Sequence, residues 1–210
     1  MVSMKKTQAF WDKNAPHYDR QSMKKYGKTY RDTIELSRRY LKPGFTVLDF
    51  GCGTGIVTVE LAASVEKIVA VDVSPAMLDA ARGKAAARGA GNIEFIVTDI
   101  FDERFNGKKF DAVCAFNILH YLPDPPAALR RISGLLAPAG VFLSTTDCWG
   151  AMNPALRTLA SLLSGVGVVP RMTHYTPPQL EAAFTEYGFR VLEARSLYPA
   201  PPNYFIAAGV

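Results

Sequence analysis

A glycine-rich turn between an apolar strand and a helix constrains this chain of 210 residues more than any other feature. The segment Thr46–Phe50 is an apolar run with a β-branched residue, which is typical of a buried strand in a parallel sheet. Gly51, Gly53 and Gly55 follow, and residues 56–61 are predicted to begin a helix. Because glycine lacks a Cβ atom and tolerates positive φ, a ligand can approach such a turn closely. The free N–H groups at the start of a helix favour a carboxylate or phosphate there.

The spacing of these glycines separates two classes of cofactor-binding turn. Dinucleotide-binding proteins carry G-x-G-x-x-G, whereas this chain has G-x-G-x-G, with Ile56 in place of the third glycine of the dinucleotide pattern. Asp49 precedes the turn and is predicted to place a carboxylate near the head of the ligand. A tight turn without any ligand is the alternative.

The stretch Val47–Gly55 resembles the first motif of the S-adenosylmethionine-dependent methyltransferases with a Rossmann-like fold, known as class I. In that family the loop wraps the methionine end of the cofactor. The resemblance therefore implies that four residues of this chain lie around that end of S-adenosylmethionine: Asp49, Gly51, Cys52 and Gly53.

Acidic residues end the next two predicted strands. The segment Lys67–Asp72 predicts a buried strand, and Ser74 then caps a helix. Asp72 can accept hydrogen bonds from both hydroxyls of a ribose, a role that also fits dinucleotide enzymes. In the family resembled, apolar residues after this acid flank the adenine, which implies Val73 and Met77 here. For Met77, ordinary core packing is an equal alternative.

Residues 92–100 predict a third strand that ends in Asp99 and Ile100. The resemblance implies that Asp99 accepts a hydrogen bond from the adenine amino group and that the next residue offers its backbone. A loop-capping role is the alternative for Asp99. The fourth strand ends in Phe116 and Asn117 and is expected to lie beside the glycine turn, as the floor of the reaction chamber.

Three residues are candidates for contact with the reacting group. Residues 10–19 resemble the aromatic-Asp-x-x-Ala-x-x-Tyr-Asp opening of small-molecule methyltransferases, whose tyrosine, here Tyr18, closes over the cofactor. Docking of the aromatic rings onto the core is the alternative. His120 follows the fourth strand, is expected to titrate near neutrality, and is a candidate general base. A ring that only hydrogen-bonds a backbone carbonyl is an equal alternative. Tyr18 and Tyr121 compete with His120 for the role of orienting the acceptor.

The alternation of strands and helices predicts one α/β domain, a three-layer sandwich with helices on both faces of a mostly parallel seven-stranded sheet. The resemblance adds an antiparallel last strand. We expect four parts of the domain: an N-terminal helical cap (1–42), a cofactor-binding half (43–146), a lid insertion (147–175), and a C-terminal helix and hairpin (176–210). A plain packing helix is the alternative to the lid.

Capping residues predict where several helices begin. Asp124 and Asn153 are predicted N-caps, and Thr176 forms a capping box with Gln179. Residues 164–170 are predicted to end the helix that begins at Asn153.

Composition narrows the class of protein. A hydrophobic content of 49% with 20% charged residues is ordinary for a globular domain. No signal peptide is visible, and no run approaches the roughly 18 apolar residues of a membrane span. Three scattered cysteines fit neither a disulfide framework nor a metal site. We therefore predict no metal and a cytoplasmic location in a reducing compartment.

The net charge of +5 is unevenly distributed. Residues 1–42 hold 11 Lys and Arg against 4 Asp and Glu, whereas residues 43–210 hold 13 against 15. A basic N-terminal part can attract an anionic substrate, nucleic acid or a membrane surface. The lysines are spread out, so a solvated helix face is the favoured interpretation. We expect a small-molecule substrate, no nucleic acid, and a monomer or homodimer.

With the resemblance, these features imply methyl transfer from S-adenosylmethionine to a small-molecule acceptor at oxygen, nitrogen or carbon, leaving S-adenosylhomocysteine. Such a reaction is an in-line displacement, in which the protein mainly aligns the reactants and excludes water. An RNA or protein methyltransferase is one alternative. A non-catalytic cofactor-binding module is the other.

Overall fold

The computed structural model describes residues 4–165 and 172–210. The strands are β1 Thr46–Phe50, β2 Lys67–Asp72, β3 Ile93–Val97, β4 Phe110–Phe116, β5 Leu136–Asp147, β6 Arg190–Pro199 and β7 Pro202–Gly209. The α-helices are α1 Met4–Arg38, α2 Thr58–Leu61, α3 Pro75–Ala87, α4 Pro125–Leu135, α5 Pro154–Gly165 and α6 Pro177–Glu186. The 3₁₀ turns are η1 Ala62–Ser64, η2 Glu103–Phe105, η3 Leu119–Tyr121 and η4 Trp149–Ala151.

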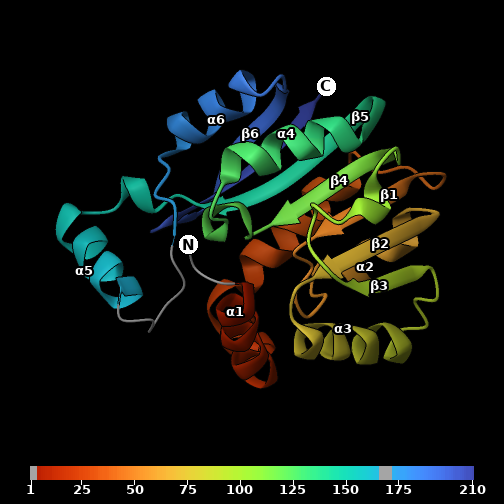
Figure 1. Cartoon of the computed structure of the whole chain (residues 1–210), viewed down its shortest axis with the longest axis horizontal. Coiled ribbons are helices and arrows are strands. Elements are labelled where there is room, and N and C mark those ends of the chain that lie inside the picture. Colours follow the sequence, from red (N-terminus) through yellow and green to blue (C-terminus); the bar gives the residue numbers. More distant parts are fainter. Residues whose placement is uncertain (1–3, 166–171) are drawn as a thin grey trace.

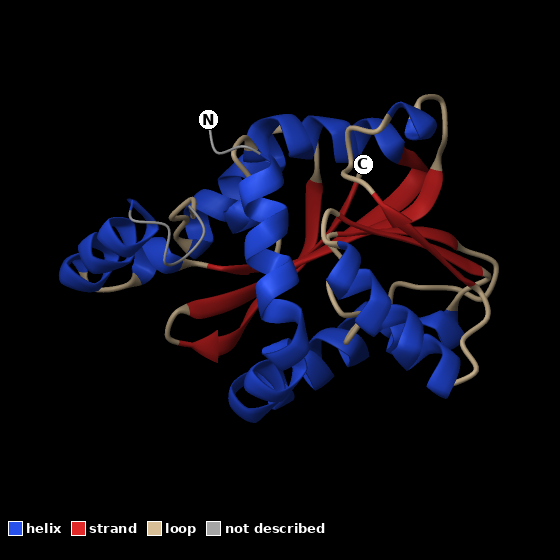
Figure 2. Ribbon diagram, turned by 60° about the horizontal axis from the view of Figure 1, so that its bottom comes forward, coloured by secondary structure: helices blue, strands red, loops and turns tan. Residues whose placement is uncertain are grey.

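The strands form one sheet in the order β3-β2-β1-β4-β5-β7-β6, with helices on both of its faces (Figures 1 and 2). Strands β1 to β5 pair in parallel, and β7 runs antiparallel to both β5 and β6. The predicted fold class is therefore confirmed, including the antiparallel last strand. Because β1 lies between β2 and β4, the carboxyl ends of these three strands meet at one edge.

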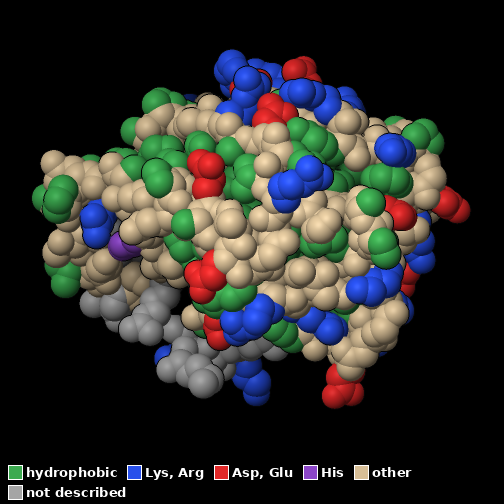
Figure 3. Space-filling view, turned by 90° about the horizontal axis from the view of Figure 1, so that it is seen from above, with side chains coloured by type: hydrophobic (Ala, Val, Ile, Leu, Met, Phe, Trp, Pro, Cys, Tyr) green, Lys and Arg blue, Asp and Glu red, His purple; other side chains and the backbone are tan. Residues whose placement is uncertain are grey.

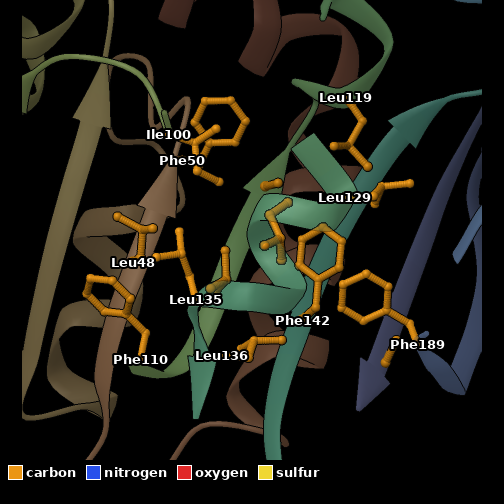
Figure 4. Close-up of a cluster of buried hydrophobic side chains, with 14 of the residues drawn as sticks. Leu48, Phe50, Ile100, Phe110, Leu119, Leu129, Leu135, Leu136, Phe142 and Phe189 are labelled. Atoms are coloured by element: carbon orange, nitrogen blue, oxygen red, sulfur yellow. The ribbon is translucent and has the colours of Figure 1, made fainter. Parts of the chain in front are cut away.

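Alternating side chains bury the sheet on both faces. Leu48 and Phe142 point to one face, where they belong to the same core cluster as residues of α4 and α6 (Figure 4). Val47 and Leu143, one position away on the same strands, point to the other face and join the second half of α1 and α2. The strands therefore carry nearly continuous hydrophobic runs, as expected for a sheet covered on both sides.

The predicted helix starts are confirmed by hydrogen bonds to backbone N–H groups. Ser74 accepts a bond from Met77 at 3.1 Å. The side chains of Asp124, Asn153 and Thr176 accept equivalent bonds at the starts of α4, α5 and α6. Thr176 and Gln179 form the predicted capping box.

Two predicted boundaries are corrected. The helix expected over residues 56–61 is only α2, which begins at Thr58 because the chain first completes the turn that Gly55 makes at φ +75°. A helix of 4 residues adds little to the electrostatic field at the glycine loop. The spacing of Leu129, Ile132 and Leu136 in the sequence predicts one buried face of the helix that Asp124 begins, but Leu136 is instead the first residue of β5, where it pairs with Phe110.

Helix α1 consists of two arms joined at Tyr26, whose φ of −119° and ψ of 16° depart from helical values. The second arm supplies Tyr30 and Ile34 to the core, whereas the first arm lies across the strand ends that form the site below. Among the described residues, no helix is both long and apolar enough to cross a membrane.

The segment predicted to be a lid holds α5, which projects away from the body of the molecule in Figure 1. Leu156, Leu159 and Leu162 of α5 are exposed. Most of the predicted break after this helix, residues 166–170, lies outside the described residues. In this conformation α5 does not cover the site.

The core on the α6 face yields a stability prediction. Phe184 is 0% exposed and stacks on Phe142 with ring centroids 5.1 Å apart. We expect Phe184→Ala to lower the free energy of unfolding by about 3–5 kcal/mol, because it leaves a cavity. Urea titration of wild type and variant measures the change. The control is Phe101→Ala, at a position that is 51% exposed, with an expected loss below about 1 kcal/mol. Equal losses would contradict this packing.

Candidate functional site

The glycine loop after β1 has positive φ at Gly51 (+70°), Gly53 (+56°) and Gly55 (+75°). A Cβ atom at Gly51 would lie 2.7 Å from Ile118, and one at Gly55 would lie 3.0 Å from Ala81. These two glycines are therefore required by the packing of the protein itself. At Gly53 a Cβ atom would meet nothing within 4 Å. The open side of the loop, where a ligand can approach the backbone, is at Gly53.

Backbone N–H groups fasten this loop to the end of β2. Gly51 and Cys52 donate to the carbonyl of Val71 at 2.8 and 3.0 Å. Gly53 donates to Oδ2 of Asp72 at 2.9 Å, and Ser74 donates to Oδ1 at 2.9 Å. Burial raises the pKa of Asp72, and these backbone donors oppose the rise. Asp72 thus joins the loop to the start of α3, and each of its oxygens keeps a lone pair for a ligand.

Asp49 lies beneath the loop. It is 3% exposed, and its Oδ2 accepts a hydrogen bond from the hydroxyl of Thr58 at 2.6 Å. Burial raises the pKa of Asp49 to about 7, against the lowering effect of the Thr58 bond. In this structure Asp49 supports the loop from below, and its predicted contact with the head of the ligand stays a prediction.

The predicted adenine-side residues lie just after β2 and β3 and, for Met77, in the first turn of α3. Asp99 accepts a bond from the backbone of Phe101 at 2.8 Å, which is the loop-capping arrangement. Ile100 is buried in the core, and Met77 is 2% exposed, as ordinary core packing requires. Val73 is half-buried beside Asp72. A role of these residues toward adenine stays a prediction.

The first arm of α1 crosses this edge and is bonded to it by two aspartates. Oδ1 of Asp12 accepts bonds from the Ser74 hydroxyl at 2.6 Å and the Ala76 backbone at 3.2 Å. Asp19 accepts a bond from the Thr54 hydroxyl and forms an ion pair with a lysine of α3. Sequence reasoning singled out the aromatic rings of this motif and missed its two acids.

Aromatic rings connect α1 to η3, the turn after β4. The ring of Trp11 lies 5.2 Å from that of Tyr121 and 6.2 Å from that of Tyr18. The hydroxyls of Tyr18 and Tyr30 share a hydrogen bond of 3.3 Å. The structure thus brings Tyr18 and Tyr121, two of the predicted acceptor-facing residues, into one aromatic cluster.

His120 does not have the properties predicted for it. The side chain is 1% exposed, and neither ring nitrogen has a hydrogen-bond partner in the described structure. Burial lowers the pKa of His120 to about 3, so the expectation that it titrates near neutrality is wrong. A ring with so low a pKa is a weak base, and the general-base hypothesis loses its premise.

An acid that sequence reasoning missed lies at the end of β5. Oδ1 of Asp147 accepts a bond of 2.7 Å from the Asn203 amide, which also donates to Asn117 at 2.7 Å. Asn117 follows β4 directly and has φ of +57°, an uncommon value for a residue other than glycine. Phe116, the last residue of β4, is half-buried. A strand ending in an acid was the signal for Asp72 and Asp99, and it would have found Asp147 too.

Two surface hollows lie away from this edge. One is lined by residues of α1 and β6, including Glu35 and Arg195, and the other by residues around Glu60 and Arg88. Neither includes a residue of the glycine loop. Among the described residues, no group of three His, Cys, Asp or Glu side chains is arranged to hold a metal ion.

Comparison with known proteins identifies the fold and its cofactor. Residues 47–140 match the family model described as a methyltransferase domain. A ubiquinone biosynthesis O-methyltransferase of Xanthomonas axonopodis pv. citri (strain 306) is 26% identical over 201 residues, covering 91% of this chain and 80% of the relative. Aklanonic acid methyltransferase DauC of Streptomyces sp. (strain C5) is 31% identical over 148 residues, which is 69% of this chain and 66% of the relative.

A solved structure of the DhpI–SAH complex superposes with a TM-score of 0.74, covers 99% of this chain and 96% of its own, and is 19% identical. At that identity it shows the shared fold. The chain belongs to the class I S-adenosylmethionine-dependent methyltransferases. It is an enzyme of that family, and S-adenosylmethionine is its cofactor.

The loop of this methyltransferase fits S-adenosylmethionine. A Cβ atom at Gly53 would meet nothing within 4 Å, so the loop leaves room for a ligand on that side. Asp72, next to that space, retains the lone pairs that ribose hydroxyls need. Ile56 stands where a dinucleotide-binding loop would have its third glycine. The chemistry of this donor set and the shape of the loop agree with the family.

The burial of Asp49 predicts a pH-dependent stability. A carboxyl whose pKa is about 7 in the folded state, against 3.8 ordinarily, contributes stability below pH 4 that is lost as pH rises toward 7. Relative to wild type, Asp49→Asn should gain up to about 4 kcal/mol in free energy of unfolding between pH 4 and pH 8, because the amide cannot ionise. Urea unfolding across this range is the measurement. Asp79→Asn, on the exposed side of α3, is the control, and parallel curves for wild type and Asp49→Asn would refute the assignment.

Proposed function

We propose that this methyltransferase transfers the methyl group of S-adenosylmethionine to a small-molecule acceptor and releases S-adenosylhomocysteine. One observation carries the proposal: the first arm of α1 is bonded through Asp12 and Asp19 across the cofactor loop, next to the aromatic cluster of Trp11, Tyr18 and Tyr121. A strand edge that a helix covers in this way suits an acceptor of small size. A long polymer would need an open groove beside the loop.

The relatives support a small acceptor. Two of them carry the names of a ubiquinone biosynthesis O-methyltransferase and an aklanonic acid methyltransferase, and both names refer to small organic molecules. At 26% and 31% identity these names indicate the size of the acceptor for this chain and leave its chemical identity open.

The proposed mechanism relies on alignment. S-adenosylmethionine supplies an activated methyl group when bound, so the protein has to hold the reactants in line and keep water out. Asp72 would fix the ribose, and the loop around Gly53 would fix the methionine end. Asp99 would meet the adenine. Helix α1 would exclude water from the methyl group, with Tyr18 and Tyr121 orienting the acceptor; a covering role for α5 would require a movement from its present position.

The alternative of a nucleic-acid substrate has weak support from the charge pattern. Several basic residues of the N-terminal part already pair with acids: Lys28 with Asp32, Arg38 with Glu60, and Arg39 with Glu193. On the face in Figure 3, Lys and Arg side chains are interspersed with Asp and Glu. An RNA-binding protein of this kind would show affinity that falls steeply with salt concentration, and binding of RNA with that dependence would favour the alternative.

Cofactor binding gives the first test. At 100 times its dissociation constant, S-adenosylhomocysteine should stabilise the fold by about 2.7 kcal/mol, which is a melting shift of roughly 5–10 °C. NADH should give no comparable shift. Asp72→Ala should lose most of the shift, since the ribose hydroxyls lose their acceptor, whereas Asp79→Ala should keep it. A shift with NADH and none with S-adenosylhomocysteine would disprove the cofactor assignment.

Turnover gives the second part of the same test. The enzyme is incubated with isotope-labelled S-adenosylmethionine and a metabolite library, and labelled products and S-adenosylhomocysteine are measured by mass spectrometry. Release of S-adenosylhomocysteine together with a labelled small molecule supports the proposal. Cofactor binding without transfer to any library member would favour a non-catalytic module.

A further inference from the structure

Three polar side chains meet where β4 and β5 end and β7 begins. The amide nitrogen of Asn203 donates to Oδ1 of Asn117 and to Oδ1 of Asp147, each at 2.7 Å. Asn203 is 4% exposed, so the amide holds the carboxylate from the buried side. Asn117 lies in the segment between β4 and η3, the turn that carries Tyr121. The carboxylate of Asp147 is therefore fixed at the strand ends, close to the segment that leads into η3.

The carboxylate of Asp147 has hydrogen-bond acceptor positions that no described residue occupies. Asn203 is its sole hydrogen-bond donor among the described residues, and none of these residues forms an ion pair with it. Lys25 is the one cation whose charge acts on its pKa, and the Lys25 ammonium lies over the ring of Tyr26, 4.8 Å from the centroid. A half-buried carboxylate that the protein leaves unneutralised calls for a cation or a proton.

An aromatic cluster lies at the same strand ends as this carboxylate: Asn117, which shares the Asn203 amide with Asp147, precedes η3, and Tyr121 of η3 packs against Trp11. Burial raises the pKa of Tyr18, Tyr30 and Tyr121, and the negative charge of Asp147 raises each of them further. The two α1 tyrosines and Tyr121 are therefore close enough to feel that charge. Trp11 belongs to the same aromatic cluster, because its ring packs against those of Tyr18 and Tyr121. One acid among aromatic rings is an arrangement that recognises organic ammonium groups.

The charge of Asp147 distinguishes amines from neutral acceptors at the binding step. The carboxylate attracts the ammonium form of an amine, and aromatic ring faces stabilise a cation, whereas an alcohol or phenol of the same shape is neutral and gains neither contact.

We propose that Asp147 binds the methyl acceptor and that the acceptor is an organic amine, held as an ammonium between the Asp147 carboxylate and the rings of Trp11, Tyr18 and Tyr121. This inference rests on the proposed function and adds the class of substrate. Asn203 is the positioning residue, since it acts only through its bond to Asp147.

The transfer step balances with the residues in the site. A primary or secondary ammonium gives one proton to Asp147, which leaves a neutral amine with a free lone pair. That lone pair forms the new N–C bond to the methyl carbon as the S–C bond breaks, with its electron pair going to sulfur. The products are a methylated ammonium and S-adenosylhomocysteine, and the proton on Asp147 is returned to water when the product leaves.

Matched probes test this proposal. Enzyme saturated with S-adenosylhomocysteine is titrated with a panel of arylalkyl- and alkylamines, each paired with the alcohol of the same shape, such as phenethylamine with 2-phenylethanol; catechol represents phenolic acceptors. Calorimetry measures the dissociation constants. We expect at least one amine to bind ten-fold or more tightly than its alcohol and than catechol, and to accept a methyl group when S-adenosylmethionine replaces the product.

Variants of Asp147 test whether its carboxylate causes the preference for amines over alcohols. Asp147→Asn keeps an acceptor for Asn203 but carries no charge, so it should lose the preference for amines while its melting shift with S-adenosylhomocysteine stays normal. Asp79→Asn should keep the preference. If Asp147→Asn does not fold, Asp147→Ser serves the same purpose, and the comparison of probes on wild type stands without either variant.

The outcomes separate this inference from the proposed function. Absence of S-adenosylhomocysteine binding would contradict the proposed function itself. Normal cofactor binding with methyl transfer to catechol, or with no amine bound better than its alcohol, would overturn the inference alone. An amine preference that survives in Asp147→Asn would remove Asp147 from the role.

Discussion

The junction between the glycine loop and the end of β2 is the constraint on which the site depends. Asp72 accepts one bond from the loop at Gly53 and one from the start of α3 at Ser74. The loop can take this path because Gly51 and Gly55 have positive φ and leave no room for a side chain. The same junction leaves Gly53 open beside the Asp72 carboxylate, and the proposed cofactor site lies there.

The first arm of α1 crosses this open edge. Asp12 bonds the start of α3 and Asp19 bonds the loop, so one helix is fastened on both sides of the proposed cofactor site. The Trp11 ring of that helix packs against Tyr121 of η3. In the proposed function, alignment and exclusion of water, the two needs of methyl transfer, come from the packing of this helix on the strand ends.

Local patterns predicted the strands, the helix caps and the cofactor loop, because these depend on neighbours in the sequence. The properties of His120 and Asp147 could not be predicted in this way. His120 lost its expected titration to burial that only the tertiary structure reveals. Asp147 gains its place through Asn203, 56 residues away, which reaches it only because β7 pairs with β5. The links from Asp12 and Asp19 to α3 and the loop are of the same long-range kind.

The central claim is that the loop around Gly53 and the carboxylate of Asp72 hold the cofactor beneath α1. The crystal structure of the complex with S-adenosylhomocysteine tests it most directly. The account predicts both ribose hydroxyls within hydrogen-bond distance of Asp72, the methionine end against Gly53, and Asp12 still bonded to Ser74. Density for the ligand elsewhere, or a ribose turned away from Asp72, would contradict it.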